Sequence, residues 1–211
     1  MQEEEPFRVA LLLLWGALFA IRAFYALRLR QAGARVTRGR QAIAREGTWH
    51  VVAQVGVFVL LVAALAVYSG RPEWMNPVTL PFPRWVRWSG ILFGVLSLVL
   101  LVWVQATLGR QWSMGVELRA QHTLVTQGPY RWVRHPMYSV LLAFLFAQCL
   151  ISANLLFILG TLVSAALLHR RMSVEEEMMT ERFGHQYAEY VGRTGRLWPH
   201  LAWGRRRPGK G

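Results

Sequence analysis

The sequence predicts an all-α, polytopic integral membrane protein with about five transmembrane helices, and three observations support this fold class. Hydrophobic residues make up 54% of the 211 residues, which is more than an ordinary water-facing surface accommodates. Charged residues make up only 17%, and they lie between apolar blocks rather than within them. Each block is long enough to cross about 30 Å of hydrocarbon as a helix of roughly 20 residues.

Four apolar blocks define the predicted spans. Residues 7–29, 48–70 and 88–108 each match one crossing. The fourth block, residues 137–168, is too long for one ordinary span, and "LISANLL" interrupts it with weak helix breakers. We therefore expect two short helices joined by a tight turn rather than one broken helix. The acidic leader "MQEEEPF" is unlike a secretory signal, so we expect the first block to be retained as a span.

The distribution of arginines predicts the orientation in the membrane. Arginines are dense in the loop after the first block and sparser in the next loop, which makes the first loop cytoplasmic. Five spans then place the N-terminus outside, and place residues 109–136 and the basic tail after residue 168 in the cytoplasm. We expect the multi-pass protein to lie in the inner membrane, in contact with anionic lipids.

Charge and cysteine content exclude other classes of protein. The formal net charge is +13, but the arginines flank apolar segments instead of forming a stripe with interleaved aromatics, so we expect no nucleic-acid partner. The only cysteine, Cys149, lies in an apolar run, which excludes an intramolecular disulfide and a cysteine-based zinc site. We expect no bound metal.

Some polar residues lie within the predicted spans, and three of them have a simple structural explanation. Arg22 is near the cytoplasmic end of its span, so we expect its side chain to snorkel to the lipid headgroups. Gln54 and Gln105 are expected to form interhelical hydrogen bonds.

The segment "HTLVTQGPYRWVRHPMY", residues 122–138, places polar groups at the edge of the membrane. Gly128-Pro129 predicts a turn, and Pro136 predicts the first turn of the next helix, where a missing amide hydrogen costs nothing. His135 precedes this helix and Tyr138 lies on its first turn. A helix start suits a carboxylate or a phosphate, but taken alone the segment is most simply an interfacial anchor.

A second polar segment follows the expected hairpin. Arg171 and Glu175 are four residues apart, so on a helix they share one face, and they lie on the same side of the membrane as His135. Taken alone, such a pair is usually a solvated ion pair.

Together the two segments resemble the isoprenylcysteine carboxyl methyltransferase family and the wider group of small membrane methyltransferases, which includes phospholipid methyltransferases. The resemblance covers residues 108–199: the segment above, R-x-x-x-E-E at 171–176, "FGHQYAEY" at 183–190, and Pro199. It divides the chain into N-terminal transmembrane helices, 1–108, and a methyltransferase core, 109–211, with a cofactor loop, a helical hairpin, a cytoplasmic helix and a basic tail. Ser139 departs from the pattern, because many relatives have glycine there.

The resemblance implies a cytoplasmic S-adenosylmethionine pocket. Arg171 is expected to face the acceptor, Glu175 to bind a polar part of the cofactor, and both to be catalytic. The other expected cofactor-binding residues are His122, Thr123, Leu124, Val125, Tyr130, His135, Pro136, Met137 and Tyr138.

Methyl transfer from a sulfonium is an in-line displacement, so the protein mainly aligns donor and acceptor and excludes water. A carboxylate acceptor needs only an orienting cation such as Arg171, whereas an amine must also lose a proton, for which Glu175, Glu176 or His135 would serve. We therefore expect an S-adenosylmethionine-dependent methyltransferase acting on a lipidic or hydrophobic acceptor, in the first place an isoprenylcysteine-type carboxylate. The alternatives are a phospholipid amine or a thiol acceptor, an NADPH-dependent sterol-type reductase, and a non-catalytic membrane scaffold.

Overall fold

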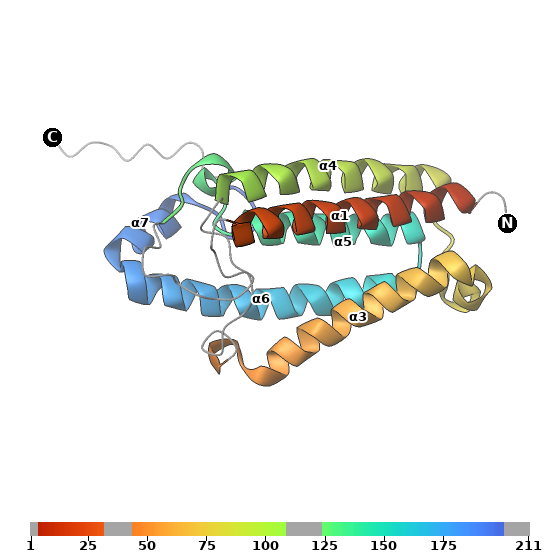
Figure 1. Ribbon diagram of the computed structural model, residues 1–211, viewed down its shortest axis with the longest axis horizontal. Coiled ribbons are helices and arrows are strands. Elements are labelled where there is room, and N and C mark those ends of the chain that lie inside the picture. The colour runs from red at the N-terminus through yellow and green to blue at the C-terminus, as the bar shows by residue number, and fades with distance from the viewer. Residues whose placement is uncertain (1–3, 32–43, 109–123, 201–211) are drawn as a thin grey trace.

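The protein folds as a bundle of long helices (Figure 1). The computed structural model describes residues 4–31, 44–108 and 124–200. Within these ranges there are helices and two isolated β-bridges but no strand. The elements in chain order are α1 (Glu5–Gln31), α3 (Thr48–Gly70), the 3₁₀ helix η1 (Pro72–Val78), α4 (Arg84–Leu108), the 3₁₀ helix η3 (Gly128–Arg131), α5 (Pro136–Ser152), α6 (Leu155–Phe183) and α7 (His185–Arg193).

Four of these helices, α1, α3, α4 and α6, are long and apolar enough to cross a membrane, and α5 is a shorter apolar helix of 17 residues. This confirms the prediction of an all-α integral membrane protein. Helix α6 has 29 residues and is about 44 Å long at 1.5 Å per residue, so its polar second half extends beyond its apolar first half.

The predicted hairpin is confirmed, because the apolar block 137–168 divides into α5 and the first half of α6. Ala153 ends α5 in the left-handed conformation, with φ of 47°, and its carbonyl accepts a hydrogen bond from the Leu80 amide at 2.6 Å. The Asn154 side chain caps α6 by accepting from the Leu156 amide at 3.0 Å. The hairpin tip therefore rests on the connection between α3 and α4.

At this end of the bundle, which we call the hairpin end, Arg87 is buried with 5% of its surface exposed. Its guanidinium donates to the carbonyl of Ile151 at 2.9 Å, to the Glu4 carboxylate at 2.6 Å and to the Tyr68 hydroxyl at 3.2 Å. It also lies over the ring of Phe7, 4.0 Å from the centroid. Arg87 thereby joins the starts of α1 and α4 to the ends of α3 and α5.

Close packing of α4 against α5 and α1 depends on small residues. A Cβ atom at Gly90 would lie 2.8 Å from the Leu150 Cβ, and one at Gly94 would lie 2.7 Å from a methyl of Leu14. Small residues of this kind let membrane helices approach closely. In Figure 1, α1, α4 and α5 lie together, and α6 and α3 lie side by side below them.

The opposite end of the bundle, which we call the site end, gathers the end of α4, the start of α5, the end of α6 and α7 (Figure 1). The two polar segments singled out in the sequence meet at this end.

Candidate active site

The start of α5 is positioned by the turn that precedes it. Gly128 opens η3 with φ of 55°, and a Cβ atom there would lie 2.7 Å from the Thr107 hydroxyl at the end of α4. Glycine is therefore required both by the backbone angle and by the close approach of the two segments. Pro136 begins α5, as predicted, and His135 is the residue just before it.

His135 lies between two carboxylates of α6. Its Nε2 is 3.1 Å from Oε1 of Glu176, its Nδ1 is 3.6 Å from Oε2 of Glu175, and its ring stacks on Tyr138 with centroids 5.6 Å apart. Burial lowers the pKa of His135, but the hydrogen bonds to Glu175 and Glu176 outweigh it, so the net pKa is raised above its usual value. The pair of carboxylates thus favours the imidazolium form.

Glu175 is shared by residues of α5 and α6. The Tyr138 hydroxyl donates to its Oε1, and Nε of Arg171 donates to the same oxygen at 3.3 Å. The Arg171 guanidinium carbon lies 5.9 Å from the centroid of the Tyr138 ring. The structure therefore brings His135, Tyr138, Arg171 and Glu175 into one network of contacts, which the sequence predicted from two segments more than thirty residues apart.

A third wall, which the sequence analysis missed, comes from α3 and the helical residues 44–46 before it. Arg171 donates to Oε1 of Gln54 at 3.4 Å and lies 3.8 Å from Oε1 of Glu46. The Gln54 amide nitrogen in turn lies 2.9 Å from Nε2 of His50. The interhelical hydrogen bond expected for Gln54 is therefore confirmed. The spacing of Glu46, His50 and Gln54, four residues apart, was the available signal for the other two.

The corresponding prediction for Gln105 was wrong. Its carboxamide is buried with 1% of its surface exposed, and neither polar atom has a hydrogen-bond partner within the described residues. Arg22, which was expected to snorkel, directs one nitrogen to the Met137 sulfur at 3.7 Å.

The back of the site is closed by the chain after α7. The amides of Arg134 and His135 donate to the carbonyls of Gly195 and Arg196 at 2.8 and 3.1 Å. Arg134 and Arg196 also bind the two oxygens of Glu176, at 3.1 and 3.2 Å. Glu176 therefore holds three basic side chains together and fixes the orientation of His135.

The Tyr190 hydroxyl on α7 stabilises η3 by donating to the Tyr130 carbonyl at 2.6 Å. Burial raises the pKa of Tyr190 to about 12, so this hydroxyl stays protonated and remains a donor.

The remaining residues expected at the cofactor lie around this network. Leu124 and Val125 are partly buried in the segment leading to η3, Tyr130 is buried within η3, and the Met137 side chain faces α1 rather than Glu175. His122 and Thr123 lie outside the residues that the structure describes.

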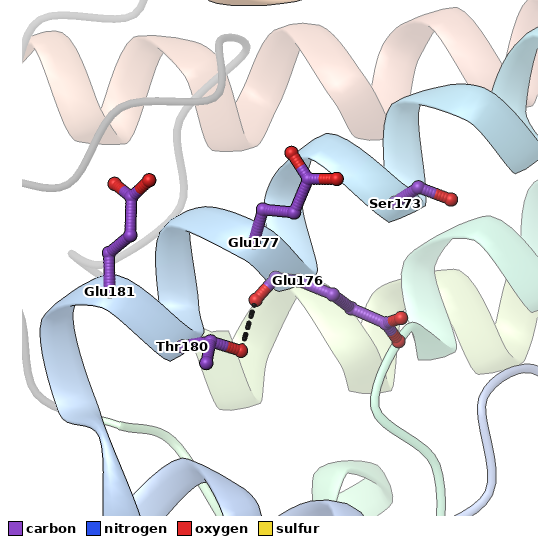
Figure 2. A pocket seen from close by; sticks show the side chains of 5 residues that line it. All are labelled: Ser173, Glu176, Glu177, Thr180 and Glu181. Carbon is purple, nitrogen blue, oxygen red and sulfur yellow. Dashed lines mark hydrogen bonds between the residues drawn. The ribbon is translucent and has the colours of Figure 1, made fainter.

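A hollow on α6 lies beside the network and is lined by acidic and hydroxyl side chains (Figure 2). Glu176 belongs to both the hollow and the His135 contacts, and its carboxylate points away from those of Glu177 and Glu181 in this view. The hydroxyl of Thr180 donates to the Glu176 carbonyl at 2.8 Å. The lining residues are Ser173, Glu176, Glu177, Thr180 and Glu181.

Part of the chain is similar to known methyltransferases. Residues 90–181 match the isoprenylcysteine carboxyl methyltransferase (ICMT) family model. The uncharacterized protein YpbQ of Bacillus subtilis (strain 168) is 31% identical over 96 residues, which are 44% of this chain and 57% of that protein. The protein-S-isoprenylcysteine O-methyltransferase of Tribolium castaneum is 32% identical over 115 residues, which are 53% of this chain and 41% of that enzyme.

A solved structure shares the fold. The eukaryotic intramembrane Ras methyltransferase ICMT is 26% identical, with a TM-score of 0.51, over 73% of this chain and 52% of that chain. This chain therefore spans about half the length of the relatives that it matches. The matched residues 90–181, which contain His135, Tyr138, Arg171 and Glu175, are therefore similar to the isoprenylcysteine carboxyl methyltransferase family, and the solved ICMT structure shares the fold.

Proposed function

We propose that the protein is an integral-membrane methyltransferase that uses S-adenosylmethionine to methylate the carboxylate of a lipidic, isoprenylcysteine-type acceptor. The observation that carries this proposal is the network of His135, Tyr138, Arg171 and Glu175 at one end of a transmembrane bundle. An interfacial anchor needs no partly buried carboxylate shared by a tyrosine, a histidine and an arginine. Such a carboxylate is needed in a site that aligns two polar reactants at the edge of a membrane.

The residues present fit the methyl donor chemically. S-adenosylmethionine carries a sulfonium, an ammonium and a carboxylate, and it supplies the electrophilic methyl group. Glu175 and the acidic hollow around Glu176 offer negative charge for the cationic groups, while the start of α5 suits the carboxylate. In this proposal Tyr138 and His135 hold Glu175, and the segment 122–125 with Tyr130 and residues 136–137 forms the rest of the pocket.

Arg171 is assigned to the acceptor. Its charge orients a carboxylate oxygen, which attacks the methyl carbon as the sulfur–carbon bond breaks. The carboxylate is already a nucleophile at neutral pH, so no general base is needed. The surrounding helices exclude water and let the acceptor enter from the lipid.

The orientation follows from the arginine distribution. We propose that the site end faces the cytoplasm of a cell whose inner membrane holds the bundle, since arginines are dense near the ends of α1 and α6. The water-soluble donor would then enter from the cytoplasm.

Purified protein in detergent tests this function. We expect it to bind S-adenosylmethionine in calorimetry and to transfer radiolabelled methyl to N-acetyl-S-farnesylcysteine, giving a product that releases methanol in alkali. Alkali-stable label in the phospholipid fraction of host membranes would instead identify an amine acceptor, and label on a small thiol would identify S-methylation. No binding at millimolar donor would refute a methyltransferase, and NADPH binding in the same assay would favour a reductase.

A further inference from the structure

The wall of the site formed by α3 lies entirely outside the residues that match the family. Glu46, His50 and Gln54, which we call the α3 stripe, precede residue 90. Glu46 is the last of the helical residues 44–46 and is separated from α3 by Gly47, whose φ of 87° is accessible to glycine. The Glu46 side chain lies in the interior, where 1% of its surface is exposed.

The α3 stripe is distinguished from its neighbours by burial. His50 is 8% exposed, whereas Trp49 is 85% exposed and Val55 is 55% exposed on the lipid side of the same helix. A helix facing lipid normally turns apolar residues outward and keeps polar residues for a partner helix. Here the partner is α6, which packs along α3.

The contacts of the α3 stripe converge on a single group, the Arg171 guanidinium. Gln54 accepts from one terminal nitrogen at 3.4 Å, and Glu46 approaches the other at 3.8 Å. Glu175 accepts from Nε at 3.3 Å. Acceptors on two elements of the chain therefore surround the three nitrogens of one planar cation.

Three acceptors around a planar cation restrict its orientation. A free arginine side chain has several rotatable bonds, and ordering it costs free energy that the acceptor would otherwise have to supply on binding. Because a misplacement of about 1 Å can cost about a hundredfold in rate, the side chains that orient Arg171 matter as much as Arg171 itself. His50 contributes indirectly, because it holds the Gln54 amide at 2.9 Å.

We propose that Glu46, His50 and Gln54 are positioning residues that preorganise Arg171 for the methyl acceptor. This inference rests on the proposed function, and it assigns part of the acceptor site to α3. His135 and Glu175, on the donor side of the site, are linked to the α3 stripe through Arg171, so the two sides meet at this guanidinium.

Gln54→Leu tests the proposal in the purified, full-length protein. We expect the KM for N-acetyl-S-farnesylcysteine to rise about tenfold, since one hydrogen bond to a charged group is lost, while the Kd for S-adenosylmethionine changes less than twofold. Gln54→Glu keeps an oxygen acceptor for Arg171 and should restore the wild-type KM. Val55→Ala, on the lipid side of the same turn, is the matched control and should change neither constant.

An unchanged acceptor KM in Gln54→Leu, or an equal loss of donor affinity, would overturn the positioning role even though methyl transfer itself persisted. If wild-type protein bound no donor, the proposed function would fail instead, so the two failures are distinct. If Gln54→Leu does not accumulate, Glu46→Gln can be used instead, because it removes the charge and keeps the shape of the side chain. The acceptor KM and the donor Kd are then compared in the same way.

A double-mutant cycle tests the contact without any acceptor. The melting-temperature shifts of Gln54→Leu and Arg171→Met should be non-additive, because both substitutions break the same interaction. Additive shifts would show that Gln54 does not hold Arg171, and would refute the proposal whichever acceptor the protein uses.

Discussion

Two buried arginines, one at each end of the bundle, show how the same residue type serves different purposes. Arg87 at the hairpin end is 5% exposed and Arg171 at the site end is 7% exposed. The contacts of Arg87 with Glu4, Tyr68 and Ile151 are 2.6 to 3.2 Å long and reach a carboxylate, a hydroxyl and a backbone carbonyl. The contacts of Arg171 with Glu46, Gln54 and Glu175 are 3.3 to 3.8 Å long. Burial alone therefore does not distinguish a structural arginine from a functional one.

The named contacts of the two arginines differ in length. Charge-assisted hydrogen bonds in proteins are typically about 2.7–2.9 Å long, so two of the Arg87 contacts are at or near their optimum, whereas the contacts of Arg171 with Glu46, Gln54 and Glu175 are longer. Arg87 also joins four helices at their ends, which is a role in stability. In the proposed function, the longer contacts of Arg171 would let its guanidinium adjust when an acceptor binds. The predictions below test this contrast between a closed end and an adaptable end.

The largest expected effect is at the shared carboxylate of the site end. Glu175→Ala removes the acceptor of both Tyr138 and Arg171, and we expect affinity for S-adenosylmethionine to fall at least about a hundredfold. Calorimetry measures this loss. Glu189→Ala, at an exposed position of α7 outside the hollow, is the control and should leave the affinity intact. Equal losses in both variants would mean that general negative charge, and not the network, binds the donor.

Replacing each of the two arginines by alanine tests whether Arg171 serves activity and Arg87 serves stability. Arg171→Ala should retain donor binding and melt within a few degrees of wild type while transfer falls about a hundredfold, or about 2.7 kcal/mol. Arg87→Ala should keep its turnover per folded molecule but lose about 3 kcal/mol of stability, which lowers the melting temperature by roughly 6–12 °C. Thermal unfolding measures the stability of both variants, and initial rates measure their methyl transfer. A lower melting temperature for Arg171→Ala than for Arg87→Ala would contradict the assigned roles.

Two buried glutamines allow the same comparison for uncharged side chains, and we expect smaller changes in stability when they are replaced. Gln148 is 1% exposed and accepts from the Trp15 indole at 3.1 Å, whereas the equally buried Gln105 has no partner within the described residues. Gln148→Leu should cost about 1–3 kcal/mol because the indole N–H is left unsatisfied, while Gln105→Leu should stabilise the protein by about 1 kcal/mol. Melting temperatures that fall in both variants would contradict this assignment.

The smallest expected effect is a pH dependence of stability at the site end. The pKa of His135 is raised in the fold, against the burial that lowers it, by Glu175 and Glu176, and Arg134 and Arg196 share the second carboxylate. The stability contributed by His135 is therefore complete below its ordinary pKa of about 6.5 and is lost as the pH rises through the folded pKa. The melting-temperature difference between wild type and His135→Gln should shrink with rising pH, and a constant difference would exclude ionisation of His135 as the cause.

The spans, the hairpin and the pairing of the two polar segments were predictable because each is a local pattern. The length of an apolar block predicts a membrane span, Pro136 predicts a helix start, and a spacing of four residues places Arg171 and Glu175 on one face of a helix. The position of the hairpin turn followed from Asn154, which caps α6.

The contacts that were missed depend on which helices lie side by side, and the sequence does not specify that. Arg87 was counted among the loop arginines, yet it lies inside α4 and is buried, because α1 and the hairpin tip cover it. Glu46 and His50 gave only a weak periodic pattern, and their importance emerges from the packing of α3 on α6. Gln105 shows the converse: its polarity suggested a partner that the neighbouring helices do not supply.

If the proposed function holds, the continuity of α6 sets the depth in the membrane at which methyl transfer takes place. Arg171 comes seventeen residues after the capping Asn154, which is about 26 Å along the helix axis, slightly less than the roughly 30 Å thickness of the hydrocarbon. A single unbroken helix cannot change this spacing, so a bilayer whose hydrocarbon begins at the hairpin end would place the guanidinium close to the opposite headgroups. In the proposed function, an acceptor would then hold its reactive group at that depth while its lipid tail remains in the bilayer. The length of α6 would thereby select acceptors by the distance between their lipid tail and their reactive group.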